Sequence, residues 1–387
     1  MFRAIKRFIR RYFVKELQIL RNIDYILYYL YYRILMPVDS KQILMLSESR
    51  QQLSGNLQYI DDKINKNEFN VIYSMKADII GKRTQNEKRK LCKKMAKSKY
   101  ILVDDFIPFI YPIPLRKATK LIQVWHAMGA FKKVGFSRMG KPGGPSPRSL
   151  SHRNYTDAIV SSEEVRKNYA EAFRMPIENI HAIGIPRTDI FFDENYKKKV
   201  KEQLYLKYPV LKDKKIILFA PTFRGNGIRT AHYDYSWISF KELQQKLGDK
   251  YFVILKWHPF IKGNPSEKLD ESFYLDLSQE REINDLLFIT DILVTDYSSV
   301  IFEASLLNKC TVFYTPDYKD YVSSRDFYYD FVEYTYGSVA QNQNELINCI
   351  KEEKIDLDKL SEFKRKFCSS CDGKSSERFV NFFFKEN

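Results

Sequence analysis

Short apolar runs rich in Val, Ile and Leu alternate with helical patterns along most of the chain. Five runs of this kind precede a lysine-rich segment at 193–209, and four follow it. Strands that are apolar throughout and separated by helices are typical of parallel sheets covered on both faces. Two such series predict an α/β protein with two doubly wound domains, which agrees with a length of 387 residues.

The residues that directly follow these runs carry most of the reactive side chains. In a doubly wound sheet, ligands bind beyond the carboxyl ends of the strands. The predicted strands at 121–125, 216–220, 252–256 and 292–295 are each followed by imidazole, guanidinium or hydroxyl groups. The candidate site residues at these positions are His126, Thr222, Arg224, His258, Ser298 and Ser299.

The stretch TDYSS at 295–299 lies between a predicted strand and a predicted helix. If Ser298 or Ser299 caps that helix, its free N–H groups and positive dipole end face the ligand crevice. Helix ends of this kind bind phosphate. We therefore predict a phosphate site at this turn, and a capped helix without a ligand is the alternative.

The chain is strongly basic, with a net charge of +16, and this charge favours an anionic partner. The first 21 residues carry seven Lys or Arg and a single Glu, and their apolar residues recur at helical spacing. We predict that residues 1–37 form a basic amphipathic segment that lies on an anionic membrane surface and is too short to span it. A helix packed on the protein's own core is the alternative.

A second basic block covers residues 82–99, with nine Lys or Arg and one Glu. Thr84 and Glu87 have the spacing of a capping box, which predicts a helix with a broad cationic face. This face is either an ordinary solvated surface or a second contact with a membrane or polyanion.

The cysteines predict neither a disulfide framework nor a metal site. Five cysteines without a secretory signal are typical of reduced cytosolic thiols, and CSSC at 368–371 lacks the second motif that a zinc site needs. The sequence also has no Asp-x-Asp pair at a strand end and no His/Cys cluster. No cofactor is therefore required, and Mg²⁺ would be auxiliary if present.

Seven segments in the same order resemble the CDP-glycerol glycerophosphotransferases of teichoic acid synthesis and their ribitol-phosphate relatives. The resemblance covers about residues 100–380. It rests on VWHAMGAFKKVG, GIPRTD, ILFAPTFR, LKWHPF, TDILVTDYSSVIFEA, RDFYYDF and DGKSSER. The segment His126-Ala127 departs from the His-Gly of many members, and the loop GFSRMGKPGGP is similar to ribitol-phosphate or polymer-extending members. The resemblance therefore leaves glycerol and ribitol open.

This resemblance implies a GT-B fold, in which two Rossmann-like domains face a central cleft. Residues 38–200 would be the acceptor domain and residues 201–387 the CDP-donor domain, with the last helix able to pack back on the acceptor domain. It implies attack of an acceptor hydroxyl on the β-phosphorus of CDP-glycerol or CDP-ribitol, with release of CMP. The expected acceptor is linked to undecaprenyl diphosphate at the cytoplasmic face of the membrane of a Gram-positive-type bacterium.

The reaction needs a base for the hydroxyl proton and groups that neutralise the diphosphate. His126 is the candidate base, because imidazole titrates near the working pH. His258 is expected to contact the diphosphate and the departing CMP, and Glu303 the ribose. Thr222, Arg224, Ser298 and Ser299 complete the expected donor site. The candidate phosphate contacts beyond these are Lys132, Arg187 and Arg325.

Two other functions stay open from the sequence. One keeps the fold but transfers a sugar from a nucleotide sugar. The other is a non-enzymatic protein that binds nucleic acid or another polyanion, as the charge and the many aromatic residues allow. We expect no nucleic-acid partner, because the sequence carries no RRM, KH or zinc-finger signature and its aromatics lie largely in apolar runs.

Overall fold

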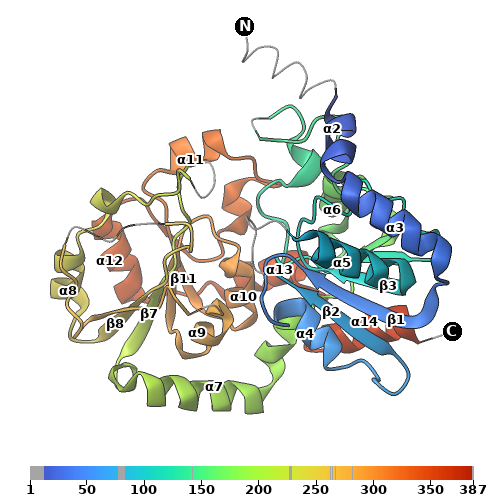
Figure 1. Cartoon of the computed structure of the whole chain (residues 1–387). Helices are drawn as coiled ribbons and strands as arrows, with labels where there is room; N and C mark the ends of the chain where they lie inside the picture. Colours follow the sequence, from blue (N-terminus) through green and yellow to red (C-terminus); the bar gives the residue numbers. More distant parts are fainter. Residues whose placement is uncertain are drawn as a thin grey trace, which may run out of the picture. The chain divides into compact units, whose positions relative to one another are not determined.

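The computed structural model describes residues 13–76, 83–141, 143–225, 229–261, 263, 265, 267–280 and 282–385. The chain divides into two compact units (Figure 1). Unit 1 contains the residues up to Asp189 together with those from Ser369 onward, and unit 2 contains Ile190–Cys368. The expected boundary after residue 200 falls inside the helix α7 (Glu194–Lys207), which packs on other helices of unit 2.

Unit 1 is built on a parallel six-stranded sheet with the strand order β2-β1-β3-β4-β5-β6. Its central strands β1 and β3 are buried on both faces, as their unbroken apolar runs predict. The strands are β1 (Asp39–Ser47), β2 (Asn70–Met75), β3 (Ser98–Val103), β4 (Lys120–Gln123), β5 (Asp157–Ile159) and β6 (Ile180–His181).

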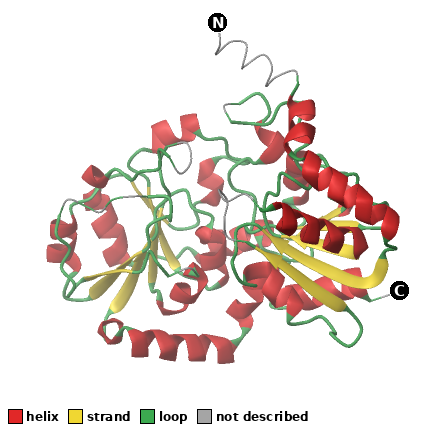
Figure 2. Ribbon diagram, in the orientation of Figure 1, coloured by secondary structure: helices red, strands yellow, loops and turns green. Residues whose placement is uncertain are grey.

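Helices cover both faces of this sheet (Figures 1 and 2). Helices α3 and α5 pack together on one face, and α4 and α14 pack together on the other. The predicted capping box at the start of α5 is confirmed, because Thr84 and Glu87 bond each other's backbone N–H groups. The α-helices are α2 (Val14–Arg21), α3 (Ile23–Leu35), α4 (Gly55–Asp61), α5 (Gln85–Lys97), α6 (Arg166–Phe173) and α14 (Ser375–Phe384).

The last helix, α14, belongs to unit 1 although it follows unit 2 in the sequence. Its first N–H groups, those of Ser375 and Ser376, donate to the carboxylate of Asp189 at 2.9 and 2.8 Å. Its buried face, with Phe379 and Phe383, joins the core formed by β1, β3, β4 and α4. The segment GIPRTD therefore ends in an aspartate that holds the start of the final helix.

Unit 2 repeats the architecture with the strand order β12-β11-β10-β7-β8-β9, again parallel. Helices α8 and α12 supply apolar side chains to the core on one face of the sheet. The strands are β7 (Lys215–Phe219), β8 (Tyr251–Leu255), β9 (Tyr274–Asp276), β10 (Ile292–Thr295), β11 (Cys310–Tyr314) and β12 (Ser338–Ala340). The remaining helices are α8 (Phe240–Leu247), α9 (Ile283–Ile289), α10 (Val300–Leu306), α11 (Tyr318–Ser324), α12 (Gln343–Glu352) and α13 (Leu357–Phe367).

Among the described residues, six short 3₁₀ segments lie in the connections between the elements above. They are η1 (Gly135–Arg138), η2 (Ile177–Asn179), η3 (Pro186–Phe192), η4 (Pro209–Leu211), η5 (Tyr235–Trp237) and η6 (Phe331–Tyr334).

Each sheet has a point where the direction of strand addition reverses. In unit 1 this switch point lies between β1 and β3, and in unit 2 it lies between β7 and β10. Loops that leave neighbouring strands diverge at such points, so the carboxyl edge of the sheet can receive a ligand there. The strand order therefore selects the loops after β7 and β10 as one candidate region and those after β1 and β3 as the other.

The predicted basic helix over residues 1–21 lies mostly outside the described residues, which begin at Phe13. The described part contains α2, and the segment after it forms α3. Tyr25 and Tyr29 of α3 are buried against unit 1, whereas Leu20, Leu27 and Ile34 are 65, 59 and 83% exposed. Among the helices that the structure describes, none has the length and apolarity needed to cross a membrane.

Candidate functional site

At the switch point of unit 2, Asp296 joins the loop after β10 to the loop after β7. One carboxylate oxygen accepts the backbone N–H of Thr222 at 2.8 Å and that of Tyr297 at 2.6 Å. The other accepts Nη1 of Arg224 at 2.9 Å. Asp296 is 2% exposed, so these bonds form in a region of low dielectric where they are strong. The aspartate of TDYSS therefore fixes the two loops that the sequence predicted to hold the donor.

Arg224 lies between two carboxylates. Besides its bond to Asp296, it forms a bidentate pair with Asp317, with Nε to Oδ2 at 2.6 Å and Nη2 to Oδ1 at 2.8 Å. Burial alone would lower the pKa of the Arg224 guanidinium, but the charges of Asp296 and Asp317 raise it above its usual value. Its positive charge is thus compensated inside unit 2. This geometry supports a role in holding the loops rather than the direct phosphate contact expected from the sequence.

Aromatic rings enclose this ion-pair cluster. The ring of Tyr297 stacks on that of Tyr321 with centroids 3.8 Å apart and planes at 5°. The Arg224 guanidinium lies 4.7 Å from the Tyr321 ring centroid and 5.0 Å from that of Trp237. A cation held against aromatic faces gains further stabilisation when it is desolvated. The cluster therefore also fixes α11 and η5 relative to the loop after β7.

The capping prediction at TDYSS is only partly met. Ser299 occupies the N-cap position of α10, but its backbone is helical (φ −66°, ψ −8°) and its side chain makes no capping bond. The hydroxyl of Ser298 accepts the N–H of Val300 at 3.4 Å, a long bond within the turn. A helical φ/ψ pair points the Ser299 hydroxyl away from the N–H groups that a cap would bond. Both serines are half-buried at the carboxyl edge of the sheet.

His258 follows β8, and its ring has a defined tautomer. Nδ1 accepts the backbone N–H of Phe260 at 3.1 Å, so in the neutral ring the proton is on Nε2. The ring packs against Phe223 and Phe260, with centroids 4.6 and 4.8 Å away. His258 is therefore oriented as a hydrogen-bond donor through Nε2, the form that suits contact with an anion.

The other predicted donor-site residues have different environments. Thr222 is buried, and its carbonyl accepts a hydrogen bond from Nη1 of Arg224. Arg325 donates to the carbonyl of Gly225, which joins the segment RDFYYDF to the loop after β7. Glu303 lies in α10 and is only 2% exposed. Because a ribose contact needs an accessible carboxylate, this burial does not support the contact expected from the sequence.

In unit 1, His126 follows β4 beside the loops of that sheet's switch point. Nδ1 lies 3.3 Å from the carbonyl oxygen of Asp104 and 3.7 Å from a carboxylate oxygen of Asp105. Both groups are acceptors, so Nδ1 carries the proton and Nε2 presents a lone pair. The side chain is 48% exposed and stacks on Trp125 with centroids 4.5 Å apart. This is the tautomer that a general base requires.

The turn that carries His126 is held by Asn56 at the start of α4. Its amide donates to the carbonyls of Val124 and Trp125 at 2.9 and 2.6 Å, and its oxygen accepts the N–H of Arg187 at 3.0 Å. Trp125 has a φ of +45°, a conformation that costs energy for a bulky residue. Asn56 thereby connects the segment VWHAMG with GIPRTD. Lys132 lies further along the same loop and is half-buried.

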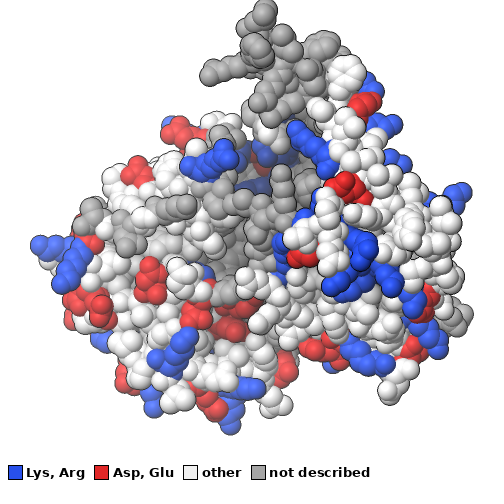
Figure 3. Space-filling model, in the orientation of Figure 1, with Lys and Arg blue, Asp and Glu red and all other residues white. Residues whose placement is uncertain are grey.

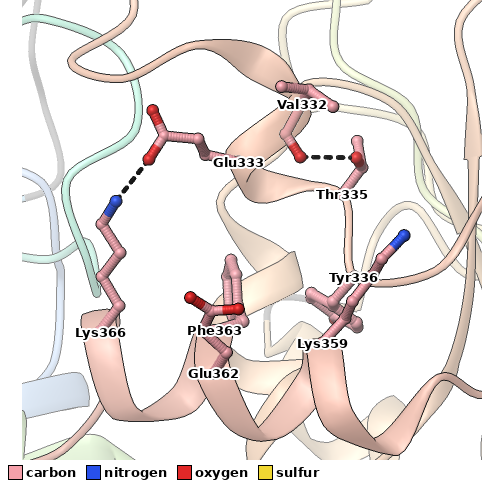
Figure 4. A pocket seen from close by; sticks show the side chains of 8 residues that line it. All are labelled: Val332, Glu333, Thr335, Tyr336, Lys359, Glu362, Phe363 and Lys366. Atoms are coloured by element: carbon pink, nitrogen blue, oxygen red, sulfur yellow. Dashed lines mark hydrogen bonds and ion pairs between the residues drawn. The ribbon is translucent and has the colours of Figure 1, made fainter.

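A pocket of 260 Å³ in unit 2 lies between η6 and α13 (Figure 4). Its charged residues have both signs, and Lys366 is paired with Glu333 across it. None of the site residues predicted from the sequence lines this pocket. Among the described residues, no group of three or more His, Cys, Asp or Glu side chains could hold a metal ion.

The sequence reasoning missed Asn56, Asp296 and Asp317. Asp296 lies directly after a buried apolar strand, a position that could have marked it as a site residue. Asp317 likewise follows β11 after two residues. Asn56 gave no comparable signal, because it lies 69 residues before the Trp125 carbonyl that it bonds.

Comparison with known proteins gives a family match and several relatives. The family model of CDP-Glycerol:Poly(glycerophosphate) glycerophosphotransferase matches residues 28–385. The chain is 47% identical to the teichoic acid poly(ribitol-phosphate) polymerase of Bacillus spizizenii, over 90% of this chain and 56% of the relative. It is 43% identical to the teichoic acid ribitol-phosphate polymerase TarK of Staphylococcus aureus, over 89% of this chain and 69% of the relative. The chain thus spans a little over half the length of the first relative.

The comparison extends to solved structures and to relatives named for another substrate. Four relatives named for glycerol phosphate are 28–33% identical. A variant of the wall teichoic acid polymerase TagF soaked with CDPG has a TM-score of 0.76 and 23% identity, and the match covers 96% of each chain. This likeness confirms the predicted α/β GT-B class, in which each unit is Rossmann-like. The basic helix expected at the N-terminus stays a prediction.

We expect Asp317→Asn to lower the free energy of unfolding by about 2–3 kcal/mol, because it leaves the buried Arg224 with a single charged partner. Urea denaturation measures this change. Asp320→Asn is the matched control, since Asp320 is exposed on the same helix that Asp317 precedes. Equal unfolding midpoints for the two variants would contradict the assignment of Asp317 to the ion-pair cluster.

Proposed function

The chain belongs to the CDP-glycerol:poly(glycerophosphate) glycerophosphotransferase family, and we propose that it transfers ribitol phosphate from CDP-ribitol to a hydroxyl of a lipid-linked teichoic acid acceptor, releasing CMP. The observation that carries this choice is the difference in identity between two groups of relatives. Relatives named for ribitol phosphate are 37–47% identical, whereas those named for glycerol phosphate are 28–33% identical. The sequence alone left the two polyols open.

In the proposed reaction, the acceptor hydroxyl oxygen forms a bond to the β-phosphorus of the donor. The bond between that phosphorus and the bridging oxygen breaks, and CMP leaves with the bridging oxygen. The hydroxyl proton passes to Nε2 of His126. The contact of Nδ1 with the Asp104 carbonyl supports this role, because it keeps the proton on Nδ1 and the lone pair on Nε2.

On the donor side, His258 is proposed to donate from Nε2 to the diphosphate as negative charge grows on the leaving CMP. The bond from the Phe260 N–H to Nδ1 supports this role, because it fixes the donating tautomer. Ser298, Ser299 and Thr222 lie on the two loops joined by Asp296 and are proposed to contact the donor phosphates. Arg325, Lys132 and Arg187 stay candidate phosphate contacts, and Glu303 the candidate ribose contact.

The function is tested by nucleotide release with primed and unprimed lipid acceptors: CMP from CDP-ribitol or CDP-glycerol, and UDP from a panel of UDP-sugars. We expect CDP-ribitol to exceed CDP-glycerol in kcat/KM by at least about tenfold, the ratio that one lost hydrogen-bonding hydroxyl group produces. Parallel assays with Mg²⁺ and with EDTA measure any auxiliary metal. Release from a UDP-sugar but from neither CDP-polyol would overturn the proposal, and more than one CMP per acceptor would indicate chain extension.

His126→Gln should reduce kcat by about 10²–10⁴ while donor affinity changes little, because only the base is lost. His258→Gln should also weaken donor binding, since its imidazole is proposed to contact the diphosphate. Calorimetric titration with the CDP-polyol separates the two effects. The control is His232→Gln, whose exposed ring bonds only the Thr230 carbonyl among described groups. Full turnover in the His126 variant would remove it as the base.

We also propose that unit 1 docks on an anionic membrane from the cytoplasmic side, where an undecaprenyl-diphosphate-linked acceptor would be presented. Exposed apolar residues at helical spacing on α2 and α3 support this contact, and we call them the apolar stripe. Lys and Arg side chains gather over the part of unit 1 that carries α5, next to the largely uncharged surface of α3 (Figure 3). Apolar and cationic groups together suit an anionic bilayer surface. The stripe consists of Phe13, Leu20, Ile23, Leu27, Tyr31, Ile34 and Leu35.

The double variant Leu27→Asp/Ile34→Asp should lower binding to phosphatidylglycerol vesicles by at least about tenfold, because two apolar side chains no longer enter the bilayer. Both positions are exposed, so the fold should persist. Co-sedimentation measures the bound fraction. Leu206→Asp is the matched control on exposed α7 of unit 2. Unchanged binding of the double variant would show that the stripe is not the membrane contact.

A further inference from the structure

Two pockets of unit 1 adjoin each other between the turn that carries His126 and helix α2. The first, of 340 Å³, is lined by Phe106, Trp125, Lys133 and Arg138 among others. The second, of 330 Å³, is lined by Val14, Leu17, Gln18 and Arg21 of α2. Both are lined by Gly144, Pro145 and Ser151, so the two pockets are neighbours. We call the two pockets together the α2 groove.

The charge of the α2 groove has one sign. Lys133 and Arg138 line its first pocket and Arg21 its second, and the described residues that line it include no Asp or Glu. A hollow with cationic groups at separate points along its length suits an anionic ligand whose charges are spaced in the same way. A single phosphate would satisfy only one end.

The wall of the groove contains two glycines that the protein's own packing requires and one exposed aromatic ring. A β-carbon at Gly135 or Gly144 would collide with the backbone oxygen of Ala172 or Arg138, so glycine is needed at both positions. Phe106 is 42% exposed beside these glycines and offers an apolar face to the carbon chain of a polyol. The lining thus combines cations for phosphates with an aromatic surface for the carbon skeleton between them.

Side chains in and beside the groove hold its wall in place. Gln18 of α2 accepts the N–H of Leu150 at 2.7 Å and donates to the hydroxyl of Ser149 at 3.2 Å. Arg174 donates to the carbonyl of Pro147 at 2.8 Å and lies 3.7 Å from the ring centroid of Phe136. These contacts connect α2 and α6 to the loop after η1. These bonds therefore fix the position of one pocket relative to the other within unit 1.

The histidine at the bottom of the first pocket carries no charge. His152 is 4% exposed and surrounded by aromatic rings, and burial lowers its pKa to about 4. Its imidazole is therefore neutral at physiological pH. The cations of the groove are thus Lys133, Arg138 and Arg21, and these are the groups that a binding experiment should vary.

The two ends of the groove adjoin features already described. Trp125, at one end, stacks on His126, the proposed base. Helix α2, at the other end, carries Leu20 of the apolar stripe, which is proposed to contact the membrane. A linear acceptor anchored in the membrane would enter near α2 and place its free hydroxyl end near Trp125.

We propose that the α2 groove binds the polyol-phosphate chain of the acceptor, with Lys133 and Arg138 on the terminal phosphodiester and Arg21 on one nearer the lipid. This inference rests on the proposed function, because it names the substrate that the base would deprotonate. It assigns to α2 a role in acceptor binding in addition to the membrane contact.

The test uses soluble ribitol-phosphate oligomers of one to eight units and the full chain, with calorimetric binding in the absence of any CDP-polyol. For wild-type protein, affinity should rise with oligomer length. Lys133→Gln/Arg138→Gln should weaken all oligomers by about tenfold or more, since charged hydrogen bonds are lost. Arg21→Gln should weaken only the longer ones, so that the gain with length disappears.

Three controls make the outcome decisive. Lys117→Gln removes the same charge from an exposed position that precedes β4, at the edge of the sheet opposite His126, and should bind every oligomer as wild type does. Lys133→Arg keeps the positive charge and should bind the oligomers about as tightly as wild type. This result would show that the loss in the Gln variant comes from the missing charge and not from unfolding. The acceptor KM in the CMP-release assay should follow the calorimetric affinities.

Equal affinity of wild type and the groove variants for oligomers of every length would overturn the inference. Because binding is measured without donor, this outcome is distinct from failure of the proposed function, which would appear as no CMP release from any CDP-polyol by wild type. Length-dependent binding that survives Arg21→Gln would likewise exclude the second pocket as part of the acceptor site.

Discussion

The carboxylate of Asp296 is the group on which the organisation of unit 2 depends. It receives two backbone N–H groups and one guanidinium, and these come from both loops that diverge at the β7/β10 switch point. A buried carboxylate without these donors would be costly to desolvate, so the loops and the charge stabilise one another. The ion pairs of Arg224 extend the same cluster to Asp317, and thus to the start of α11.

The two histidines illustrate how backbone groups can assign different chemistry to the same side chain. His126 meets a carbonyl oxygen at Nδ1, whereas His258 meets an N–H group at the equivalent atom. The first ring therefore keeps its lone pair on Nε2, and the second keeps its proton there. His126 can therefore accept a proton at Nε2 and His258 can donate one from Nε2, because a different backbone group faces Nδ1 of each ring.

The sequence predicted the strands and the residues at their carboxyl ends well, because apolar runs and the reactive groups after them are local signals. The structure places His126, His258, Ser298 and Ser299 after strands, as predicted, and their roles stay predictions. The ion-pair cluster was not predicted, because its bonds join distant positions: Arg224 and Asp317 are 93 residues apart. Local propensity also misjudged Ser299, whose helical backbone leaves its hydroxyl without a capping bond. Pairings of this kind depend on tertiary packing, which no single stretch of sequence encodes.

The position of α14 has a consequence for how the chain is made. Unit 1 is interrupted by the whole of unit 2 and is completed only when Ser369 and the residues after it have left the ribosome. Until then its core lacks Phe379, Phe383 and Phe384, and the carboxylate of Asp189 lacks the N–H groups of Ser375 and Ser376. Unit 2 is continuous in the sequence, so it can fold during synthesis. Unit 1, which carries His126, completes its fold after unit 2 has been synthesised.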